Sequence, residues 1–169
     1  MKKKSLEIVY EKYSQEVYLY AFSLCKDHYL AQDLTSDTFF KALLSIKDDN
    51  IEIKYWLFRV CKNLWLDNLK YRKRFSTNPL ETSHIPTEDN TLLKIINDEE
   101  RRNLYMAILT LPPASMEVVI LFYFCNMSLK NIAENLNMNP GAARTLLFRA
   151  RQKLKTLLEE DIKWPFVNY

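Results

Sequence analysis

The chain has 169 residues, of which 48% are apolar and 27% charged, so it can form one or two globular domains with a buried core. It contains a single glycine, which argues against hairpin-rich β structure and phosphate-binding glycine loops. No apolar run approaches the roughly 20 residues that span a bilayer, and Glu7, Glu11 and Lys12 interrupt what would be the apolar part of a signal peptide. We therefore expect a cytosolic protein without membrane insertion.

The net charge of +3 is distributed unevenly along the chain. Residues 1–74 carry 14 basic and 10 acidic side chains, residues 75–100 carry one and six, and residues 101–169 carry nine and five. This pattern predicts two basic lobes on either side of an acidic connector.

The first lobe shows apolar residues at three- and four-residue steps, which predict helices over about 5–25, 28–47 and 53–74. Asp27 is a suitable N-cap for the second of these helices. On the outer face of that helix Asp33, Asp37 and Lys41 follow one another at four-residue steps. Such a row is either ordinary ion pairing on a helix surface or a charged docking face.

The end of the third helix combines positive charge with aromatic rings. Residues 59–74 hold six cations against one acid, with Tyr71 among them and Trp56 and Trp65 upstream. Cations that follow phosphates and rings that stack on bases suit single-stranded nucleic acid. A basic helix end also complements the helix dipole, so the pattern alone leaves both interpretations open.

Residues 75–90 show no apolar period and are rich in Ser, Thr, Asn, Pro and acids, which predicts a flexible acidic linker. Helices are predicted again over about 91–110 and 113–125. The first ends before the two prolines at 112 and 113, because proline disfavours helical geometry in the residue before it. The second of these helices is apolar almost throughout and too short to cross a bilayer. We expect it to be the buried core helix of the second lobe.

Residues 128–155 contain two helical patterns around a short break. Ser128 and Asn139 are good N-caps, Pro140 suits the first position of a helix, and Asn137 tolerates the left-handed conformation of a helix end. The second pattern carries five cations and no acid: Arg144, Arg149, Arg151, Lys153 and Lys155. This is typical of a helix-turn-helix with a basic recognition helix, although two core helices with one solvated basic face remain the alternative.

Residues suited to catalysis or metal binding are scarce. Cys25, Cys61 and Cys125 are widely spaced in apolar helical surroundings, as core cysteines usually are. The two histidines, His28 and His84, have no partners in a nucleophile–base pattern. We predict no metal, no cofactor, no small-molecule substrate and no enzyme activity.

Several stretches, in the same order and at similar spacing, resemble those of one family. They are DLTSDTFFKA at 33–42, WLFRVCKNLWLD at 56–67, the start of the second lobe at 111–118, and the helix-turn-helix segments at 128–134, 141–145 and 148–151. The chain resembles an extracytoplasmic-function (ECF) sigma factor, the small two-domain class of bacterial RNA polymerase initiation subunits.

The resemblance implies an all-α fold of two small helical domains joined by the flexible acidic linker. Residues 1–74 would be sigma region 2, which docks on the polymerase and recognises and melts the promoter −10 element. Residues 75–90 would be the linker, and 91–169 would be sigma region 4, whose helix-turn-helix recognises the −35 element. The implied function is promoter-specific transcription initiation by a sigma factor that binds core RNA polymerase and both elements.

The resemblance also assigns roles to individual residues. Polymerase contacts fall on Asp33, Leu34, Asp37, Phe39 and Lys41. Contacts with the −10 element fall on Trp56, Asn63, Asp67, Asn68, Lys70, Tyr71, Arg72, Lys73 and Arg74. Contacts with the −35 element fall on Arg144, Thr145, Phe148 and Arg149 in the major groove, with Arg151, Lys153 and Lys155 on phosphates.

The partners that the family implies are core RNA polymerase, through the clamp helices of its largest subunit and its flap, and promoter DNA. An anti-sigma factor, often at the membrane, is a further partner of many members. The chain departs from the family at several positions, where Met116 and Phe122 replace usual arginines and Asn126 and Asn137 replace usual glycines. Two other interpretations are a stand-alone helix-turn-helix transcriptional regulator and a helical protein-interaction module.

Overall fold

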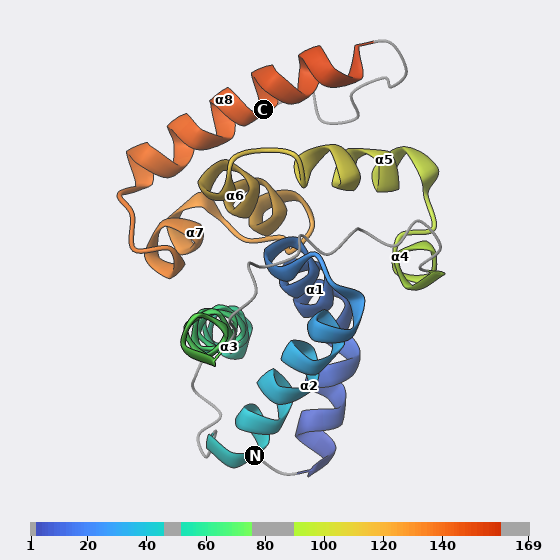
Figure 1. The fold of residues 1–169 in the computed structure, drawn as a ribbon, viewed down its shortest axis with the longest axis vertical. Coiled ribbons are helices and arrows are strands. Elements are labelled where there is room, and N and C mark those ends of the chain that lie inside the picture. Colours follow the sequence, from blue (N-terminus) through green and yellow to red (C-terminus); the bar gives the residue numbers. More distant parts are fainter. Residues whose placement is uncertain (1–2, 46–51, 76–89, 160–169) are drawn as a thin grey trace. The chain divides into compact units, whose positions relative to one another are not determined.

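The computed structural model describes residues 3–45, 52–75 and 90–159. Over these ranges the chain forms helices and no strands, which confirms the predicted all-α fold. It divides into two compact units, Met1–Glu88 and Asp89–Tyr169 (Figure 1). The predicted linker, 75–90, lies almost wholly outside the described residues, so the domain limits at 74 and 91 stay predictions. None of the helices in the described ranges is long and apolar enough to cross a membrane.

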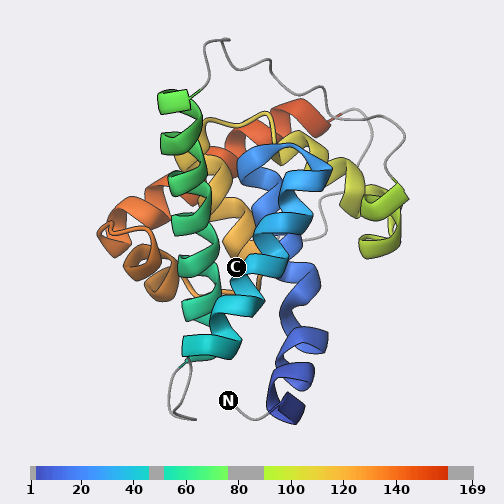
Figure 2. The ribbon, with the colours of Figure 1, turned by 60° about the horizontal axis from the view of Figure 1, so that its bottom comes forward.

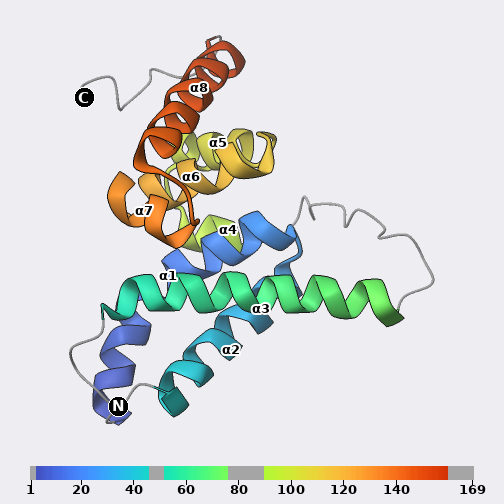
Figure 3. The same ribbon diagram turned by 90° about the vertical axis from the view of Figure 1, so that its left-hand side faces the viewer.

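The first unit contains three helices, α1 (Lys3–Cys25), α2 (His28–Ser45) and α3 (Ile53–Phe75). α1 and α2 lie side by side, and α3 packs against both of them (Figures 1 and 3). A tight turn joins α1 to α2, with Lys26 in the left-handed region at φ 54°. The predicted cap is confirmed, because Asp27 Oδ1 accepts a hydrogen bond from the Leu30 amide at 2.9 Å.

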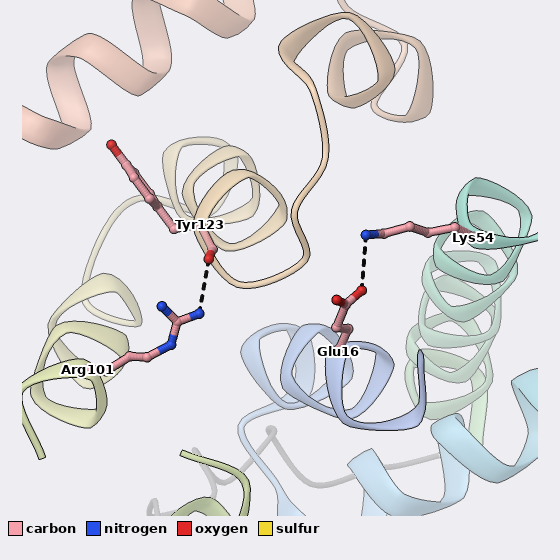
Figure 4. Close-up of polar contacts among 4 residues, drawn as sticks. All are labelled: Glu16, Lys54, Arg101 and Tyr123. Carbon is pink, nitrogen blue, oxygen red and sulfur yellow. Dashed lines mark hydrogen bonds and ion pairs between the residues drawn. The ribbon is translucent and has the colours of Figure 1, made fainter. Parts of the chain in front are cut away.

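The core of the first unit is built around aromatic rings. Tyr20 of α1 and Phe58 of α3 are fully buried, and their rings meet edge to face at 5.4 Å. Burial of side chains this large contributes about 1.5–3 kcal/mol each to folding. At the edge of this core Lys54 of α3 pairs with Glu16 of α1 at 3.2 Å (Figure 4). These contacts fix the orientation of α3, the predicted −10 helix, on its unit.

The second unit contains α4 (Asn90–Ile95), α5 (Glu99–Ile108), α6 (Pro113–Tyr123), α7 (Leu129–Asn135) and α8 (Pro140–Leu158). All six residues of α6 from 116 to 121 are buried, because α5, α7 and α8 surround it (Figure 1). This confirms the predicted core helix. Five of these six residues are apolar, Glu117 being the exception, and a helix that is apolar on almost every side needs such a shell of neighbours.

The prediction of one helix over 91–110 is wrong, because the chain breaks between α4 and α5. Asp98 caps α5, and its Oδ1 accepts a hydrogen bond from the Arg101 amide at 3.1 Å. The Arg102 guanidinium donates to the carbonyls of Ile96 at 2.6 Å and Asn97 at 2.9 Å, where α4 ends. The two side chains satisfy backbone groups that an unbroken helix would have paired internally.

The helix-turn-helix forms as predicted in its local chemistry. Ser128 Oγ accepts from the Asn131 amide at 3.2 Å and caps α7. Asn137 adopts a left-handed conformation at φ 53°, and Asn126 does the same at φ 52° before α7. Asn is among the few residue types other than glycine that visit this region routinely, which accounts for asparagine at two positions where the family usually has glycine. α8 ends at Leu158, three residues beyond the last basic residue of the predicted recognition helix, Lys155.

Candidate nucleic-acid interface

α8 has a core face and an outward face. Ala143, Leu147, Ala150 and Leu154 recur at steps of four, three and four residues and are buried against the unit. The four side chains predicted to enter the major groove are exposed on the other sides of the helix: Arg144, Thr145, Phe148 and Arg149. The Phe148 ring is 60% exposed. α8 therefore presents positive charge and one apolar ring together.

The start of α8 is fixed by its cap. Asn139 Oδ1 accepts hydrogen bonds from the amides of Gly141 at 2.7 Å and Ala142 at 3.2 Å. A side chain on Gly141 would place its Cβ 3.0 Å from that same oxygen, so the one glycine of the chain stands where the cap is tightest. Thr145 Oγ1 donates to the Gly141 carbonyl at 3.0 Å.

Arg151 differs from the other basic residues of α8 because it is anchored to α6. Its Nε donates to the Tyr123 hydroxyl at 2.6 Å, and its guanidinium lies 5.5 Å from the centre of the Tyr123 ring and 5.7 Å from that of Phe122. The predicted phosphate contact at Arg151 would thus come from a half-buried group held by α6, whereas Lys153 and Lys155 are exposed.

A second arginine holds the other side of the end of α6. Arg101 Nη2 donates to the Tyr123 carbonyl at 3.2 Å (Figure 4), and its guanidinium lies 4.4 Å from the centre of the Phe124 ring. Two of the positions where the family usually has arginine are occupied differently here. Phe122 forms part of the surface beneath Arg151, and Met116 is buried.

α3 carries an exposed stripe opposite its buried residues. Trp56, Asn63, Asp67, Lys70 and Arg74 follow one another at steps of seven, four, three and four residues, which places them on one face of a helix. Trp56 is half-buried and the other four are exposed. The structure therefore brings five of the nine predicted −10 residues together.

The other four predicted −10 residues lie elsewhere on α3. Asn68 and Arg72 are half-buried on the side nearer the core, while Lys73 and Tyr71 are exposed. The Tyr71 ring lies 4.7 Å from the ring of Phe75, a residue outside the predicted site. Phe75 was missed because the predicted helix ended at 74, although its four-residue spacing from Tyr71 is a signal that the sequence contains.

α2 presents the predicted docking face only in part. Asp33, Asp37 and Lys41 are exposed, as a contact with another protein would require. Leu34 and Phe39 are 4% and 5% exposed, and the Phe39 ring packs edge-on against Tyr10 of α1 at 4.9 Å. The predicted contact of Leu34 and Phe39 with the polymerase stays a prediction; in this conformation both side chains are buried and hold α2 in the core.

Apolar surface outside the predicted site lies beside this docking face. Phe40 and Leu44 are mostly exposed on α2. An open groove of about 600 Å³ runs between α1 and α2. Its lining residues are Leu6, Glu7, Tyr10, Glu11, Phe39, Phe40 and Leu43.

The cysteines lie in or near the cores, in keeping with their predicted role. Burial raises the pKa of the Cys61 thiol to about 12 and that of the Cys25 thiol to about 11. Cys125 is also buried. Within the described residues no three side chains of His, Cys, Asp or Glu gather as metal ligands would.

Two family descriptions match the chain. Residues 9–75 match Sigma-70 region 2, and residues 101–154 match Sigma-70, region 4. The ECF RNA polymerase sigma factor SigM of Bacillus subtilis (strain 168) is 29% identical over 161 residues, covering 94% of this chain and 98% of that protein. The RNA polymerase sigma factor YlaC of the same organism is 30% identical over 161 residues, covering 89% and 90%.

Two solved structures share the fold. The sigma factor RpoE from Bartonella quintana, in complex with the anti-sigma factor NepR, superposes with a TM-score of 0.68 at 21% identity, covering 94% of this chain and 99% of that one. CnrH, in complex with the cytosolic domain of CnrY, gives a TM-score of 0.67 at 20% identity, covering 95% and 92%. Since both sigma-70 regions occur here in one helical chain, and since its similarity to SigM and YlaC extends over nearly their whole length, the protein belongs to the ECF sigma factors of bacterial RNA polymerase.

Proposed function

We propose that this sigma factor divides promoter recognition and polymerase binding among three surfaces: the outward face of α8, the exposed stripe of α3, and the outer face of α2. The observation that supports this most directly is that both matched regions present an exposed basic helix face opposite a well-packed core. As an initiation factor, the chain would act by binding alone, without chemistry of its own.

α8 would read the −35 element in the major groove. Arg144 and Arg149 are suited to guanine, because a guanidinium can donate two hydrogen bonds to its O6 and N7 atoms. The exposed ring of Phe148 offers apolar contact to a thymine methyl group. Lys153 and Lys155 would hold phosphates, which adds affinity without sequence preference.

α3 would hold the opened −10 element. Lys70, Lys73 and Arg74 supply charge along the helix end, and Asn63 and Asp67 supply polar groups that can pair with base edges. Capture of extruded bases of the non-template strand would offset the few kcal/mol that unpairing costs. Promoter melting then needs only this binding free energy.

α2 would dock on the clamp helices of the largest polymerase subunit. The exposed Asp33, Asp37 and Lys41 would give the contact its charge pattern, and the neighbouring Phe40 and Leu44 would add the apolar area that such interfaces bury. Region 4 would meet the polymerase flap, and the acidic residues 75–90 would pass through the RNA exit region.

An anti-sigma factor is a further expected partner. RpoE was solved with the anti-sigma factor NepR, and CnrH with the cytosolic domain of CnrY. By analogy, a partner of this kind would cover α2 and α8 and could hold this sigma factor, a cytoplasmic protein, at the membrane. The signal that releases it would then set when the promoter surfaces become available.

Reconstituted transcription tests the proposal. The purified chain is added to bacterial core polymerase and a library of promoter DNA, and run-off transcripts with defined start points are expected. The double substitution D33A/D37A should weaken the complex with core polymerase, whereas Gln32→Ala, an exposed change off that face of the same helix, should not. If the wild-type chain forms no complex with core polymerase, the proposed function is wrong.

The stand-alone regulator is the less favoured alternative, because residues 9–75 match Sigma-70 region 2, which a sensor lobe does not require. Such a regulator would bind duplex promoter DNA tightly without polymerase. Binding of the purified chain to duplex promoter DNA, measured with and without core polymerase, separates the two functions.

A further inference from the structure

The end of α3 carries two exposed aromatic rings in contact with each other. Tyr71 and Phe75 are four residues apart, so they lie on the same side of the helix. Their ring centres are 4.7 Å apart, their planes are inclined by 39°, and the residues are 64% and 70% exposed. In Figures 2 and 3 the last turns of α3 extend beyond the turn that joins α1 and α2, so the rest of this unit does not cover the pair.

The charges around the pair indicate what it binds. Arg72, Lys73 and Arg74 lie between the two rings in sequence, and the nearest acid along the helix is Asp67. Exposed rings interleaved with cations are the combination that binds single-stranded nucleic acid, with rings on bases and cations on phosphates. An apolar protein or membrane partner is a poorer fit, because the adjacent stripe of α3 is charged rather than apolar.

The spacing of the rings determines how a base can bind. A base held between two rings needs about 7 Å between them, twice the roughly 3.4 Å spacing of stacked bases. At 4.7 Å the pair has no room for this, so a base must lie on the outside. Phe75, the more exposed ring and the last residue of α3, offers that outer surface, and Tyr71 supports it from the preceding turn.

We propose that Tyr71 and Phe75 form a stacking platform for one unpaired base of the opened promoter strand. The proposal rests on the proposed role of α3 in holding the −10 element, and adds Phe75 to it. Stacking is tolerant of sequence because every base has a π-face. The platform would therefore lengthen the lifetime of the open complex, while the choice of bases falls to polar side chains such as Asn63.

An abasic-site scan tests the platform with the intact holoenzyme. Promoter fragments with a single-stranded −10 non-template strand are prepared with one base at a time removed, and the lifetime of each complex is measured. We expect Phe75→Ala to shorten the lifetime on the intact strand by on the order of tenfold. At one position, removal of the base should shorten the lifetime of the wild-type complex but not that of the Phe75→Ala complex. Phe75→Trp should restore the wild-type response at that position.

Two variants of the same helix serve as matched controls. Leu66→Ala removes an exposed apolar side chain without removing a ring, and should leave the abasic profile unchanged. Lys73→Ala removes a cation, and should shorten lifetimes by a similar factor on every strand while keeping the wild-type profile. Because Phe75 is largely exposed, its substitution should leave the helical circular dichroism spectrum unchanged.

The platform is refuted if the Phe75→Ala holoenzyme still transcribes from its promoter and keeps the wild-type abasic profile. It is also refuted if Phe75→Ala weakens binding to core polymerase without changing that profile, since the rings would then contact protein. If the wild-type holoenzyme forms no open complex at all, the proposed function itself fails, and the inference fails with it.

Discussion

Two arginines of α8 show that the surroundings of a side chain, more than its type, decide what it can do. Arg144 is exposed near the start of the helix, where its guanidinium can turn toward DNA. Arg151 is two turns further on and is bound to the Tyr123 hydroxyl over two aromatic rings. We therefore expect base specificity from Arg144 and a combined structural and electrostatic role from Arg151.

Arg144→Ala should weaken binding by about 1–3 kcal/mol at one preferred base pair of the −35 element and relax specificity there. The reason is that Arg144 would lose its hydrogen bonds to a base edge, and only one of the four base pairs at that position offers the matching acceptors. Binding of holoenzyme to promoters mutated at each −35 position measures this. A uniform loss on all sequences, as we expect for Lys153→Ala, would instead identify Arg144 as a phosphate contact.

The buried thiol of Cys61 should make stability depend on alkaline pH. Burial raises its pKa from 9.0 to about 12, so the folded protein keeps a proton that the unfolded chain loses above pH 9. The protonated Cys61 thiol therefore makes its full contribution to the free energy of unfolding below pH 9. That contribution is lost as pH rises toward 12, at about 1.4 kcal/mol per pH unit.

Urea unfolding of the wild type and of Cys61→Ala, at about pH 8.5 and about pH 10, measures this dependence. The difference in unfolding free energy between the two proteins should shrink by on the order of 1 kcal/mol at the higher pH. Equal differences at both pH values would mean that the thiol does not resist ionisation.

At the scale of the element, the start of α8 depends on one asparagine and one glycine. Asn139 satisfies two amides that the helix leaves without partners, and Gly141 leaves room for the Asn139 oxygen. Alanine is the better helix former, so glycine at this position is explained by the cap rather than by helix propensity. The two residues should therefore be energetically coupled.

A double-mutant cycle at these positions measures that coupling. Asn139→Ala should cost about 1 kcal/mol of stability, because two amides lose their acceptor. Gly141→Ala should stabilise the N139A protein by up to about 1 kcal/mol, but the wild type by less, because there the added Cβ crowds the cap oxygen. The free energies of unfolding are measured by chemical denaturation. If the effects of the two substitutions are additive, the Cβ added at position 141 does not destabilise the cap, and the predicted coupling is absent.

Local chemistry was predictable from the sequence, whereas contacts between distant residues were not. The caps at Asp27, Ser128 and Asn139 and the left-handed Asn137 depend on residues one to four positions away, and all were anticipated. The break at Asp98 was missed because apolar periodicity continues across it.

The sequence was less informative about which faces are covered. The burial of Leu34 and Phe39 depends on packing within the unit, for instance of Phe39 against Tyr10, and the anchoring of Arg151 depends on Tyr123, 28 residues away. Spacing along one helix shows which residues share a face, but not which neighbouring element covers that face. The predicted roles of individual residues in DNA and polymerase binding remain predictions.

At the scale of the whole molecule, the affinity for promoter DNA should contain two electrostatic contributions, one from each unit. Cations on α8 face duplex phosphates in our proposal, and those at the end of α3 face an opened strand. Each removes counterions from DNA, so the affinity of the holoenzyme should fall steeply with salt.

Removing these cations one at a time tests that view. Lys153→Ala or Lys155→Ala should reduce the slope of log affinity against log salt concentration by about 0.9, and Lys70→Ala or Lys73→Ala by about 0.7. Lys94→Ala, which removes an exposed cation of α4 outside the helix-turn-helix, is the control and should leave the slope unchanged. An unchanged slope for all the α8 and α3 variants would mean that these faces are merely solvated.

The separation of core and outward residues on α8 has a practical consequence for redesign. Stability rests on Ala143, Leu147, Ala150 and Leu154, whereas the four side chains assigned to the −35 element point elsewhere. The outward set can therefore be randomised as a library in an unchanged scaffold, and variants can be selected for new promoters. Variation of the outward residues of this one helix, with its cap and its anchor to α6 kept constant, would give a set of synthetic sigma factors that each recognise a different promoter.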